Sequence, residues 1–323
     1  DSAFGEYLGF LCVEEELSFE LDDAGEHVYL LIEKRELNTD EVARRIAKFA
    51  KAKSVDIGYA GLKDRNAVTR QWFSVRVPIK KELDWSEIES DRVKVLQTRR
   101  NSRKLRRGAI VGNRFHLVVR DIGGAPDLID DRLRLIASCG FPNYFGEQRF
   151  GRNADNIPQA QQLFSGEIRI NQRHLRSLLI SSARSFLFNH VLAARIRNRT
   201  WNHVIHGDLM QLDGTNRFFK LEQIDQVILE RIHTLDIHPT GVLWGAPPAL
   251  VEKTAYYLEL NTLSEFPLFM EGLERAGLKQ ERRALRIRVR DMEWKFRDQN
   301  TLEWRFMLPP GAYATVMFRE VFG

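Results

Sequence analysis

The sequence predicts an α+β protein in which strands from both ends of the chain build one sheet. Residues Phe10–Phe19 and Glu26–Glu33 have hydrophobic or alternating strand patterns, and Arg282–Val289 alternates in the same way near the C-terminus. The segment 153–282 between them is more helical in pattern. With 323 residues, the chain is long enough for one large domain or two ordinary ones.

The composition indicates a globular protein, because 43% of the residues are hydrophobic and 29% are charged. The formal net charge of +5 is a modest excess, and it is weak evidence for a polyanionic partner. The two cysteines, Cys12 and Cys139, are far apart and imply neither a disulfide framework nor a metal site. No apolar run is long enough to span a bilayer and no signal-peptide pattern is present, so we expect a reduced cytoplasmic protein.

A helix is expected over residues 40–51. Asn38 can cap this helix, and Glu41 three residues later is the matching partner of a capping box. One apolar stripe follows the helix and consists of Val42, Ile46 and Phe49. A short buried strand over Val55–Tyr59 is expected to follow.

The stretch Gly58–Trp72, GYAGLKDRNAVTRQW, contains the strongest candidate for chemistry. Asp64 is expected in a turn after the buried strand, between Lys63 and Arg65 and before a strand over Gln71–Val77. Neighbouring cations keep a carboxylate ionised. Loops at strand ends on a rigid scaffold are also where catalytic groups are usually found. The alternative is a solvated surface turn, which spacing alone favours.

The densest basic run is RRNSRKLRRG, Arg99–Gly108, and its six cations are Arg99, Arg100, Arg103, Lys104, Arg106 and Arg107. Such a run is usually a solvated loop. Clustered arginines with few acids nearby are also typical of phosphate contacts in nucleic-acid-binding proteins. We favour phosphate binding because the run leads directly into the next motif.

That motif, GNRFHLVVR at Gly112–Arg120, predicts a strand with Phe115 on its apolar face. On this pattern alone Phe115 is a core residue. After a helix over residues 126–139 comes GFPNYFGEQRFGR, Gly140–Arg152. Its aromatic residues around Arg149 form either a loop packed by its own rings or part of an RNA groove.

The remaining elements are expected to be helical first and then extended. They are a long helix at Leu178–Arg199, a hairpin at Gly207–Leu221 with its turn at Asp213 and Gly214, strands at Arg282–Val289, Met292–Phe296 and Thr301–Leu308, and a short C-terminal helix after Tyr313. The late strands are expected to complete the sheet that the first half begins.

Four segments, AGLKDRNAVTRQ, GNRF, NYFGEQRFG and LPPGAYATVMFREVF, closely resemble motifs of the TruD family of tRNA pseudouridine synthases, in the same order. The resemblance extends from about Val13 to Phe322. It implies an α+β, pseudouridine-synthase-like catalytic domain with a mixed or largely antiparallel sheet, over residues 1–140 plus 285–323. An inserted α+β TRUD domain, residues 141–284, interrupts it.

The resemblance also implies roles for individual residues. Asp64 matches the family's catalytic carboxylate, and Asn113 and Phe115 match the residues that contact the flipped uracil. An Asn side chain suits this task because its amide offers both a donor and an acceptor. The family's first-strand Phe corresponds to Phe10, or to Leu11 if the match shifts by one residue. The Lys that usually precedes that Phe has no counterpart in Ser2–Tyr7.

The remaining expected contacts are cationic. Lys63 is expected to bind substrate beside Asp64, and the candidates for RNA binding are Arg99, Arg103, Lys104, Arg106, Arg107 and Arg149. The reaction implied is isomerisation of uridine to pseudouridine, with uridine 13 of tRNA(Glu) as the family's usual target. It needs no cofactor, metal, membrane or protein partner, only tRNA. Asp64 would act as a nucleophile or as a base, and the sequence does not choose between these routes.

Two other classes of function compete with this interpretation. An RNA-binding protein without catalysis would share the basic run and the aromatic loop but would not need Asp64. A nuclease or phosphotransferase would normally have clustered carboxylates for metal ions, or a pair of histidines for acid–base work. Neither arrangement occurs at convincing spacing in the sequence.

Overall fold

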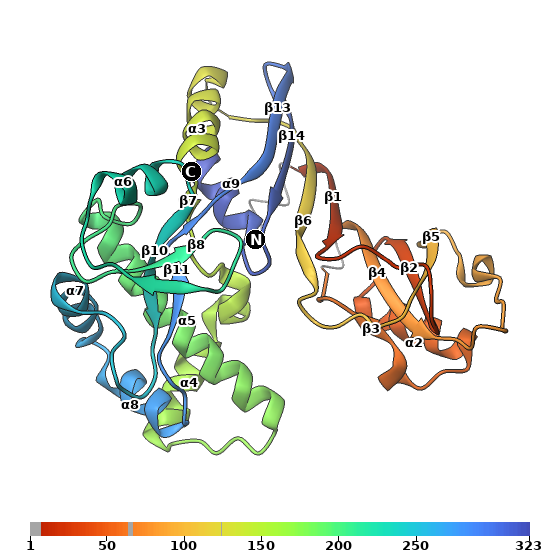
Figure 1. Ribbon diagram of the computed structural model, residues 1–323, viewed down its shortest axis with the longest axis horizontal. Coiled ribbons are helices and arrows are strands. Elements are labelled where there is room, and N and C mark those ends of the chain that lie inside the picture. The colour runs from red at the N-terminus through yellow and green to blue at the C-terminus, as the bar shows by residue number, and fades with distance from the viewer. Residues whose placement is uncertain (1–7, 64–66, 124) are drawn as a thin grey trace. The chain divides into compact units, whose positions relative to one another are not determined.

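Strands from both ends of the chain build one large sheet, as the sequence predicts. The computed structural model describes residues 8–63, 67–123 and 125–323. It divides into two compact units (Figure 1). The sheet unit comprises residues 5–126 and 290–310, and the helical unit comprises residues 127–289 and 311–323 together with 1–4. The predicted bounds of a catalytic and an inserted domain place residues 127–140, 285–289 and 311–323 with the sheet instead, and that functional division stays a prediction.

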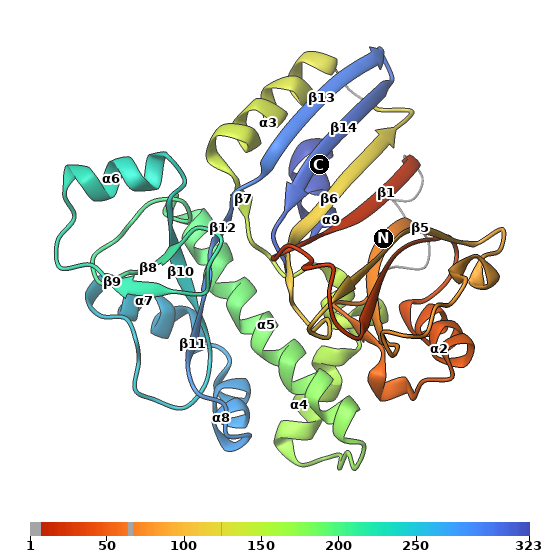
Figure 2. The same cartoon turned by 45° about the vertical axis from the view of Figure 1, so that its right-hand side comes forward.

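The sheet unit contains a mixed, largely antiparallel sheet in the order β13-β14-β6-β1-β4-β2-β5, with β3 paired to β4. Figure 2 shows β13, β14, β6 and β1 side by side. Only the β1–β4 pair is parallel. The strands are β1 Leu8–Leu17, β2 His27–Lys34, β3 Gly58–Tyr59, β4 Val68–Arg76, β5 Val93–Asn101, β6 Ile110–Val119, β13 Arg290–Asp298 and β14 Thr301–Leu308. The expected α+β fold class is confirmed.

The register of the strands decides which side chains share a face of this sheet. Across β1 and β6, Val13 is opposite Phe115 and Glu15 is opposite Asn113. Because successive side chains of a strand point to opposite faces, residues 11, 13 and 15 share one face and residues 10, 12 and 14 share the other. We call the first the helix face, because α2 packs on it, and the second the charged face, which carries Arg70 with its acidic partners.

Helix α2, Thr39–Ala50, begins as predicted at the N-cap Asn38, where the Glu41 carboxylate accepts the Asn38 N–H at 2.8 Å. Its stripe packs on the helix face, with Val42 and Ile46 fully buried and Phe49 at the margin. Burying one such aliphatic side chain contributes about 1.5–3 kcal/mol.

The expected strand over Val55–Tyr59 is wrong in its first half. Residues Ser54–Asp56 form a 3₁₀ turn closed by the Asp56 N–H on the Lys53 carbonyl at 2.8 Å. Val55 is therefore on the surface, 74% exposed. Only Gly58 and Tyr59 reach β4, because the turn uses the residues before them.

In the helical unit, the long helix α5 packs against β10, α4, α7 and α8 through an apolar face that contains Leu179, Ala183, Leu187 and Val191 (Figure 1). Its helices are α3 Pro126–Cys139, α4 Asn156–Ser165, α5 Arg173–Arg197, α6 Gln226–His233, α7 Lys253–Leu263, α8 Pro267–Arg275 and α9 Ala314–Phe322. Its strands are β7 Phe141–Pro142, β8 Leu209–Leu212, β9 Phe218–Lys220, β10 Ile237–Leu243, β11 Glu281–Ala284 and β12 Arg286–Ile287.

Two of the predictions for this unit have different outcomes. The hairpin is confirmed, because β8 and β9 pair antiparallel on either side of Asp213 and Gly214. The single strand over Arg282–Val289 is instead divided at Leu285. Its two parts pair with different partners, β11 with β10 and β12 with β7, and the Leu285 N–H donates to the Pro239 carbonyl.

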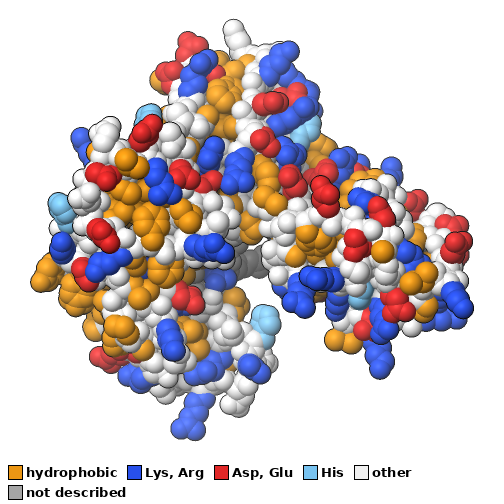
Figure 3. All heavy atoms as spheres, in the orientation of Figure 1, with side chains coloured by type: hydrophobic (Ala, Val, Ile, Leu, Met, Phe, Trp, Pro, Cys, Tyr) orange, Lys and Arg blue, Asp and Glu red, His pale blue; other side chains and the backbone are white. Residues whose placement is uncertain are grey.

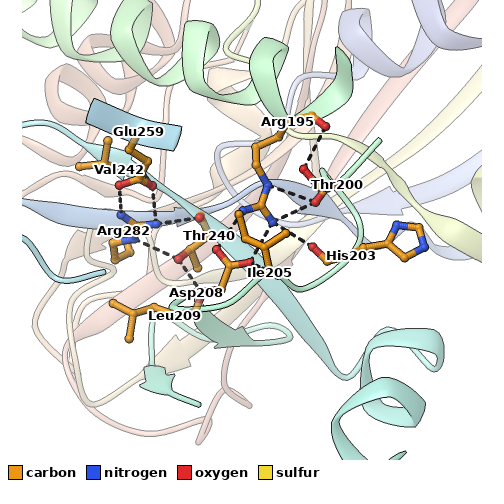
Figure 4. Close-up of polar contacts among 10 residues, drawn as sticks. All are labelled: Arg195, Thr200, His203, Ile205, Asp208, Leu209, Thr240, Val242, Glu259 and Arg282. Atoms are coloured by element: carbon orange, nitrogen blue, oxygen red, sulfur yellow. Dashed lines mark hydrogen bonds and ion pairs between the residues drawn. The ribbon is translucent and has the colours of Figure 1, made fainter. Parts of the chain in front are cut away.

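Two buried ion pairs tie this unit together (Figure 4). Arg282 on β11 contacts both carboxylate oxygens of Glu259 at 2.7 and 2.9 Å. Arg195 on α5 contacts both oxygens of Asp208, each at 2.9 Å. A buried charge without a partner is strongly destabilising, so each of these cations is matched by its own carboxylate.

Candidate active site

The side chain of Lys63, directly before Asp64 in the sequence, is fixed by Glu15 of β1. Its Nζ lies 2.7 Å from Oε1 of Glu15, and the two side chains are 9% and 0% exposed. The other oxygen of Glu15 accepts the backbone N–H of Trp72 at 3.1 Å. Burial raises the pKa of the Glu15 carboxyl, and the Lys63 charge opposes that rise. Lys63 therefore has one defined position and is not a freely moving surface lysine.

The backbone that leads to position 64 is held by side chains of α2 and β4. Gln71 donates from Nε2 to the Gly61 carbonyl at 2.6 Å and accepts from the Thr39 hydroxyl at 3.0 Å. The same hydroxyl oxygen accepts the Lys63 N–H at 3.0 Å. The chain thus enters position 64 from a fixed backbone, while Asp64 itself lies outside the described residues.

Asn113 and Phe115 lie on the helix face of the sheet, two residues apart on β6. Asn113 is opposite Glu15, and its Oδ1 is buried without a hydrogen-bond partner among the described residues. Phe115 is partly buried and stacks on Phe306, with ring centres 5.0 Å apart and planes at 17°. An unused acceptor next to an aromatic ring can bind a planar heterocycle that carries an N–H group.

Phe10 is not brought together with these residues. It lies on the charged face, 39% exposed, with its ring 5.6 Å from that of His116. Leu11 lies on the helix face, opposite Leu117. The placement of the strand therefore favours the alternative match, in which Leu11 and not Phe10 takes the first-strand position near Asn113 and Phe115.

The basic run is mostly engaged within the sheet unit. The interactions are an ion pair of Arg99 with Asp23, bonds of Arg100 to the Gly25 and Val77 carbonyls, a bond of Lys104 to the Val55 carbonyl, and Arg107 stacked 3.8 Å above the Tyr59 ring. In the described part of the chain, the side chains of Arg103 and Arg106 make no hydrogen bond or ion pair, and both are exposed. These two are the best placed of the run for a phosphate.

The basic side chains are not gathered into one patch on the visible surface. Lys and Arg alternate there with Asp and Glu over both units (Figure 3). This agrees with the small net charge of +5. Individual arginines without acidic partners are therefore more informative here than the overall charge.

Arg149 lies in the helical unit, in the 3₁₀ turn Glu147–Phe150. Its Nε donates to the Ser185 hydroxyl at 3.1 Å, and its Nη2 donates to the Ser181 hydroxyl. The loop before it is clamped to α5 by Asn189, which accepts the Phe145 N–H at 2.9 Å and donates to the Phe145 carbonyl at 3.0 Å. Arg149 is thus presented by a rigid loop.

Sequence reasoning missed Glu15, Gln71 and Thr39. One signal for Glu15 was available: it continues the alternation of Leu11 and Val13, so a charged residue occupies an apolar face of the strand. A carboxylate on such a face needs a cationic or hydrogen-bonding partner. No comparable pattern indicates Gln71 or Thr39.

Neither a metal nor a membrane is indicated by the described ranges. Within residues 8–63, 67–123 and 125–323, no three His, Cys, Asp or Glu side chains are grouped so as to bind a metal ion. None of the helices in these ranges combines the length and apolar character needed to cross a bilayer.

Comparison with known proteins identifies the family of this chain. The model of the TruD family, described as tRNA pseudouridine synthase D, matches residues 9–168 and 153–321. A tRNA pseudouridine synthase D from Methylococcus capsulatus is 46% identical over 309 residues, 96% of this chain and 87% of the relative. Another from Nitrosococcus oceani is 47% identical over 311 residues, with the same two coverages of 96% and 87%.

A solved structure agrees at the level of the fold. A protein from Methanosarcina mazei, described as a TruD protein, superposes with a TM-score of 0.75 over 98% of this chain and 93% of its own, at 19% identity. The α+β fold and the family match together define a tRNA pseudouridine synthase, which is an isomerase. Within that class, the chain belongs to the TruD family.

Proposed function

We propose that this protein converts uridine to pseudouridine in tRNA, with uridine 13 of tRNA(Glu) as the expected target and Asp64 as the catalytic carboxylate. The observation that carries the proposal is the buried Oδ1 of Asn113, which has no hydrogen-bond partner among the described residues and lies on the same strand face as Phe115. These groups share a face of the sheet with Glu15. Glu15 forms an ion pair with Lys63, the residue directly before Asp64 in the chain.

The reaction breaks the C1′–N1 bond of uridine, turns the detached uracil and joins it again through C5; the proton on C5 is then lost and N1 takes up a proton. The target base must leave its stack, which costs a few kcal/mol. Stacking on an aromatic ring returns about 1–3 kcal/mol, and Phe115 is the proposed ring. The Asn113 oxygen accepts a hydrogen bond from a uracil N–H, which holds the base while the sugar reacts.

Asp64 has two chemically balanced routes. In the first, its carboxylate adds to C1′ as a nucleophile and releases uracil, and attack of C5 on C1′ then breaks the C1′–carboxylate bond and frees Asp64. In the second, it removes the C2′ proton as the base departs and a glycal forms, and the proton returns later. Lys63 is held by the Glu15 carboxylate and, through its backbone N–H, by the Thr39 hydroxyl, and these contacts fix the backbone that enters position 64. Both routes need no bound metal or redox group.

The remaining features of the proposal concern partners and organisation. Exposed Arg103 and Arg106 bind tRNA phosphates, no protein partner is required, and the protein acts in the cytoplasm. The catalytic domain is residues 1–140 plus 285–323, and the inserted domain is residues 141–284. The basis for this division is the family resemblance and the sheet built from both chain ends.

Replacement of Asp64 by Asn tests the proposal. With tRNA labelled with tritium at uridine C5, Asp64→Asn should release no tritium, while its affinity for tRNA stays within a small factor of the parent. Asp127→Asn, an equivalent change at an exposed site in the first turn of α3, should behave as the parent does. Normal tritium release by Asp64→Asn would remove this residue from the chemistry.

A further inference from the structure

Two arginines of the helical unit lie close to one aromatic ring. The guanidinium carbon of Arg283 on β11 lies 4.0 Å from the centre of the Phe145 ring, and that of Arg149 lies 5.7 Å from it. Both guanidinium groups are partly buried. Contact with a ring face stabilises a cation modestly, by about 0.5–2 kcal/mol, and does not neutralise it.

Neither arginine has an acidic partner among the described residues. Arg283 donates from Nη2 to the Asn143 side-chain oxygen at 2.6 Å and to the Gly311 carbonyl at 2.9 Å, and its Nε is buried without a partner. Arg149 donates only to the hydroxyls of Ser181 and Ser185. All these acceptors are neutral, and the Nη1 group of each arginine makes no hydrogen bond to the described residues.

Other buried arginines of the same unit have a carboxylate as a direct or indirect partner. Arg195 and Arg282 each contact both oxygens of a buried carboxylate (Figure 4). Arg286 is connected to Asp213 through His238, which accepts from Arg286 at Nδ1 and contacts Asp213 through Nε2. Among the described residues, Arg149 and Arg283 have neither a contacting carboxylate nor one relayed through a histidine, and in this respect they are an exception in this unit.

The exception has an electrostatic cost. Burial lowers the pKa of Arg283 to about 10, and the charge of Arg149 lowers it as well. With a pKa of about 10, Arg283 still carries its charge at neutral pH, and the Arg149 guanidinium lies over the same ring. Because uncompensated buried charge is strongly unfavourable, an external anion that binds here gains energy from both cations.

The surrounding contacts fix the geometry before any ligand binds. The side-chain amide of Asn189 bonds to both the N–H and the carbonyl of Phe145. The Asn143 side chain donates to the Ala284 carbonyl at 2.7 Å, which fixes its position. The Tyr313 ring packs edge-on to Phe145, with centres 6.2 Å apart. A pre-formed pair of guanidinium groups matches the spread oxygens of a phosphate better than a single flexible lysine does.

We infer that Arg149 and Arg283 form a binding site for one phosphodiester group of the RNA backbone. The inference rests on the proposed function in one respect, namely that the bound polyanion is tRNA. Each arginine offers its unused Nη1 group, and the phosphate supplies the negative charge that the described residues lack. The Phe145 ring and the clamped loop hold the two cations in place.

The test is the salt dependence of tRNA binding. Unmodified tRNA is titrated into the parent, Arg149→Gln, Arg283→Gln and Arg283→Lys at several KCl concentrations. Each Gln variant should bind about tenfold or more weakly, as expected for the loss of a charged hydrogen bond. Each should also reduce the magnitude of the slope of log K against log salt, by up to about 0.7–0.9, the change for complete loss of one phosphate contact. Arg283→Lys should keep the parental slope, because its charge is preserved.

Arg275→Gln is the matched control. It removes the same charge from an exposed side chain of the helical unit that is already paired with Glu271, so both affinity and slope should stay at the parental values. Melting temperatures without RNA identify any variant that is unfolded. If Arg283→Gln does not fold, Arg149→Gln carries the test, because among the described residues the Arg149 side chain donates hydrogen bonds only to two hydroxyls.

The outcomes separate this inference from the proposed function. Parental slopes in both Gln variants would overturn the phosphate site, even if the parent forms pseudouridine normally. A reduced slope in both variants supports the site, even if the parent releases no tritium from labelled tRNA. In that second case the RNA site would stand and the proposed catalytic activity would fail.

Discussion

Lys63 and Glu15 form a buried ion pair, with 2.7 Å between Nζ and Oε1. The two residues are 48 positions apart in the sequence, and Lys63 immediately precedes Asp64. Burial alone would disfavour both charges, and a buried ion pair is seldom more stabilising than an apolar pair of the same size. The role of the pair is therefore better explained by positioning of the backbone than by stabilisation of the fold, because it fixes the segment between β3 and residue 64.

Glu15→Gln should therefore reduce catalysis more than tRNA binding. The change keeps the size of the side chain but leaves Lys63 as a buried cation without its carboxylate. We expect kcat to fall at least tenfold with KM for tRNA nearly unchanged, and the free energy of unfolding to fall by about 3–5 kcal/mol. Glu14→Gln is the control, since its partner Arg70 and Glu14 itself are both 40% exposed. Parental kcat in a folded Glu15→Gln variant would contradict a positioning role.

Asn113→Leu should separate stability from activity. The buried Oδ1 of Asn113 has no partner among the described residues, so the fold does not gain from that oxygen. Removing it should leave the free energy of unfolding unchanged or raise it by about 1–3 kcal/mol, the cost of an unsatisfied buried polar group. Pseudouridine formation should nevertheless fall sharply, as measured by tritium release.

Asn101→Leu is the comparison for that variant. Asn101 is buried and fully engaged: it accepts from the Asp22 N–H at 3.2 Å and donates to the Arg103 carbonyl at 3.0 Å. Its replacement should destabilise the protein. If Asn113→Leu loses as much stability as Asn101→Leu, the Asn113 side chain is structural and the uracil contact is unsupported.

Phe115→Leu and Phe10→Leu should differ because the two rings lie on opposite faces of the sheet. Loss of base stacking costs about 1–3 kcal/mol, so Phe115→Leu should lower kcat/KM by roughly 5–150-fold. Phe10→Leu, whose ring contacts His116 on the charged face, should lower it less than twofold. A larger effect at Phe10 than at Phe115 would restore the original match of Phe10 to the first-strand position.

Much of this arrangement follows from patterns that are local in sequence. The capping box of Asn38 and Glu41, the hairpin at Asp213 and the strand faces of β4 and β6 each depend on neighbours within a few residues. Alternation and capping chemistry report such features directly, because the side chains that make them are close in the chain. The Gly112–Phe115 motif was predicted as a strand for this reason.

The features that were not predicted depend on partners that are distant in the chain. Pairing with both β10 and β7 divides the segment Arg282–Val289, and no local pattern marks the division at Leu285. Gly112 is required because a Cβ there would lie 2.4 Å from the Leu308 carbonyl of β14, a strand almost two hundred residues later. The Glu15–Lys63 ion pair likewise depends on two residues that are distant in the chain, so no local pattern predicts it.

Arg103 and Arg106 should account for most of the contribution of the basic run to RNA binding. Their side chains are exposed and unpaired within the described ranges, whereas Arg99 is held by Asp23. The double change of both residues to Gln should reduce the salt slope for tRNA by about 1.4–1.8, which corresponds to two phosphate contacts. As the control, Arg35 and Arg92 are both changed to Gln. Each is paired with an acid of the sheet unit, so this double variant should keep the parental salt slope. Equal slopes for the two double variants would return the run to a solvated loop.

Glu303 on β14 should make stability depend on pH in the acidic range. Hydrogen bonds from Arg297 and His116 hold the pKa of its carboxyl at about 2, below the ordinary value of 4.5. A carboxyl with a lowered pKa in the folded state stabilises the fold above its unfolded pKa, and this contribution disappears as the pH falls toward the folded pKa. The parent should therefore be more stable than Glu303→Gln at pH 6, and the difference should shrink between pH 4.5 and pH 2. Urea unfolding at pH 6, 4 and 3 measures it, with Glu293→Gln on β13 as the control. A difference independent of pH would show that the Glu303 charge does not contribute to folding.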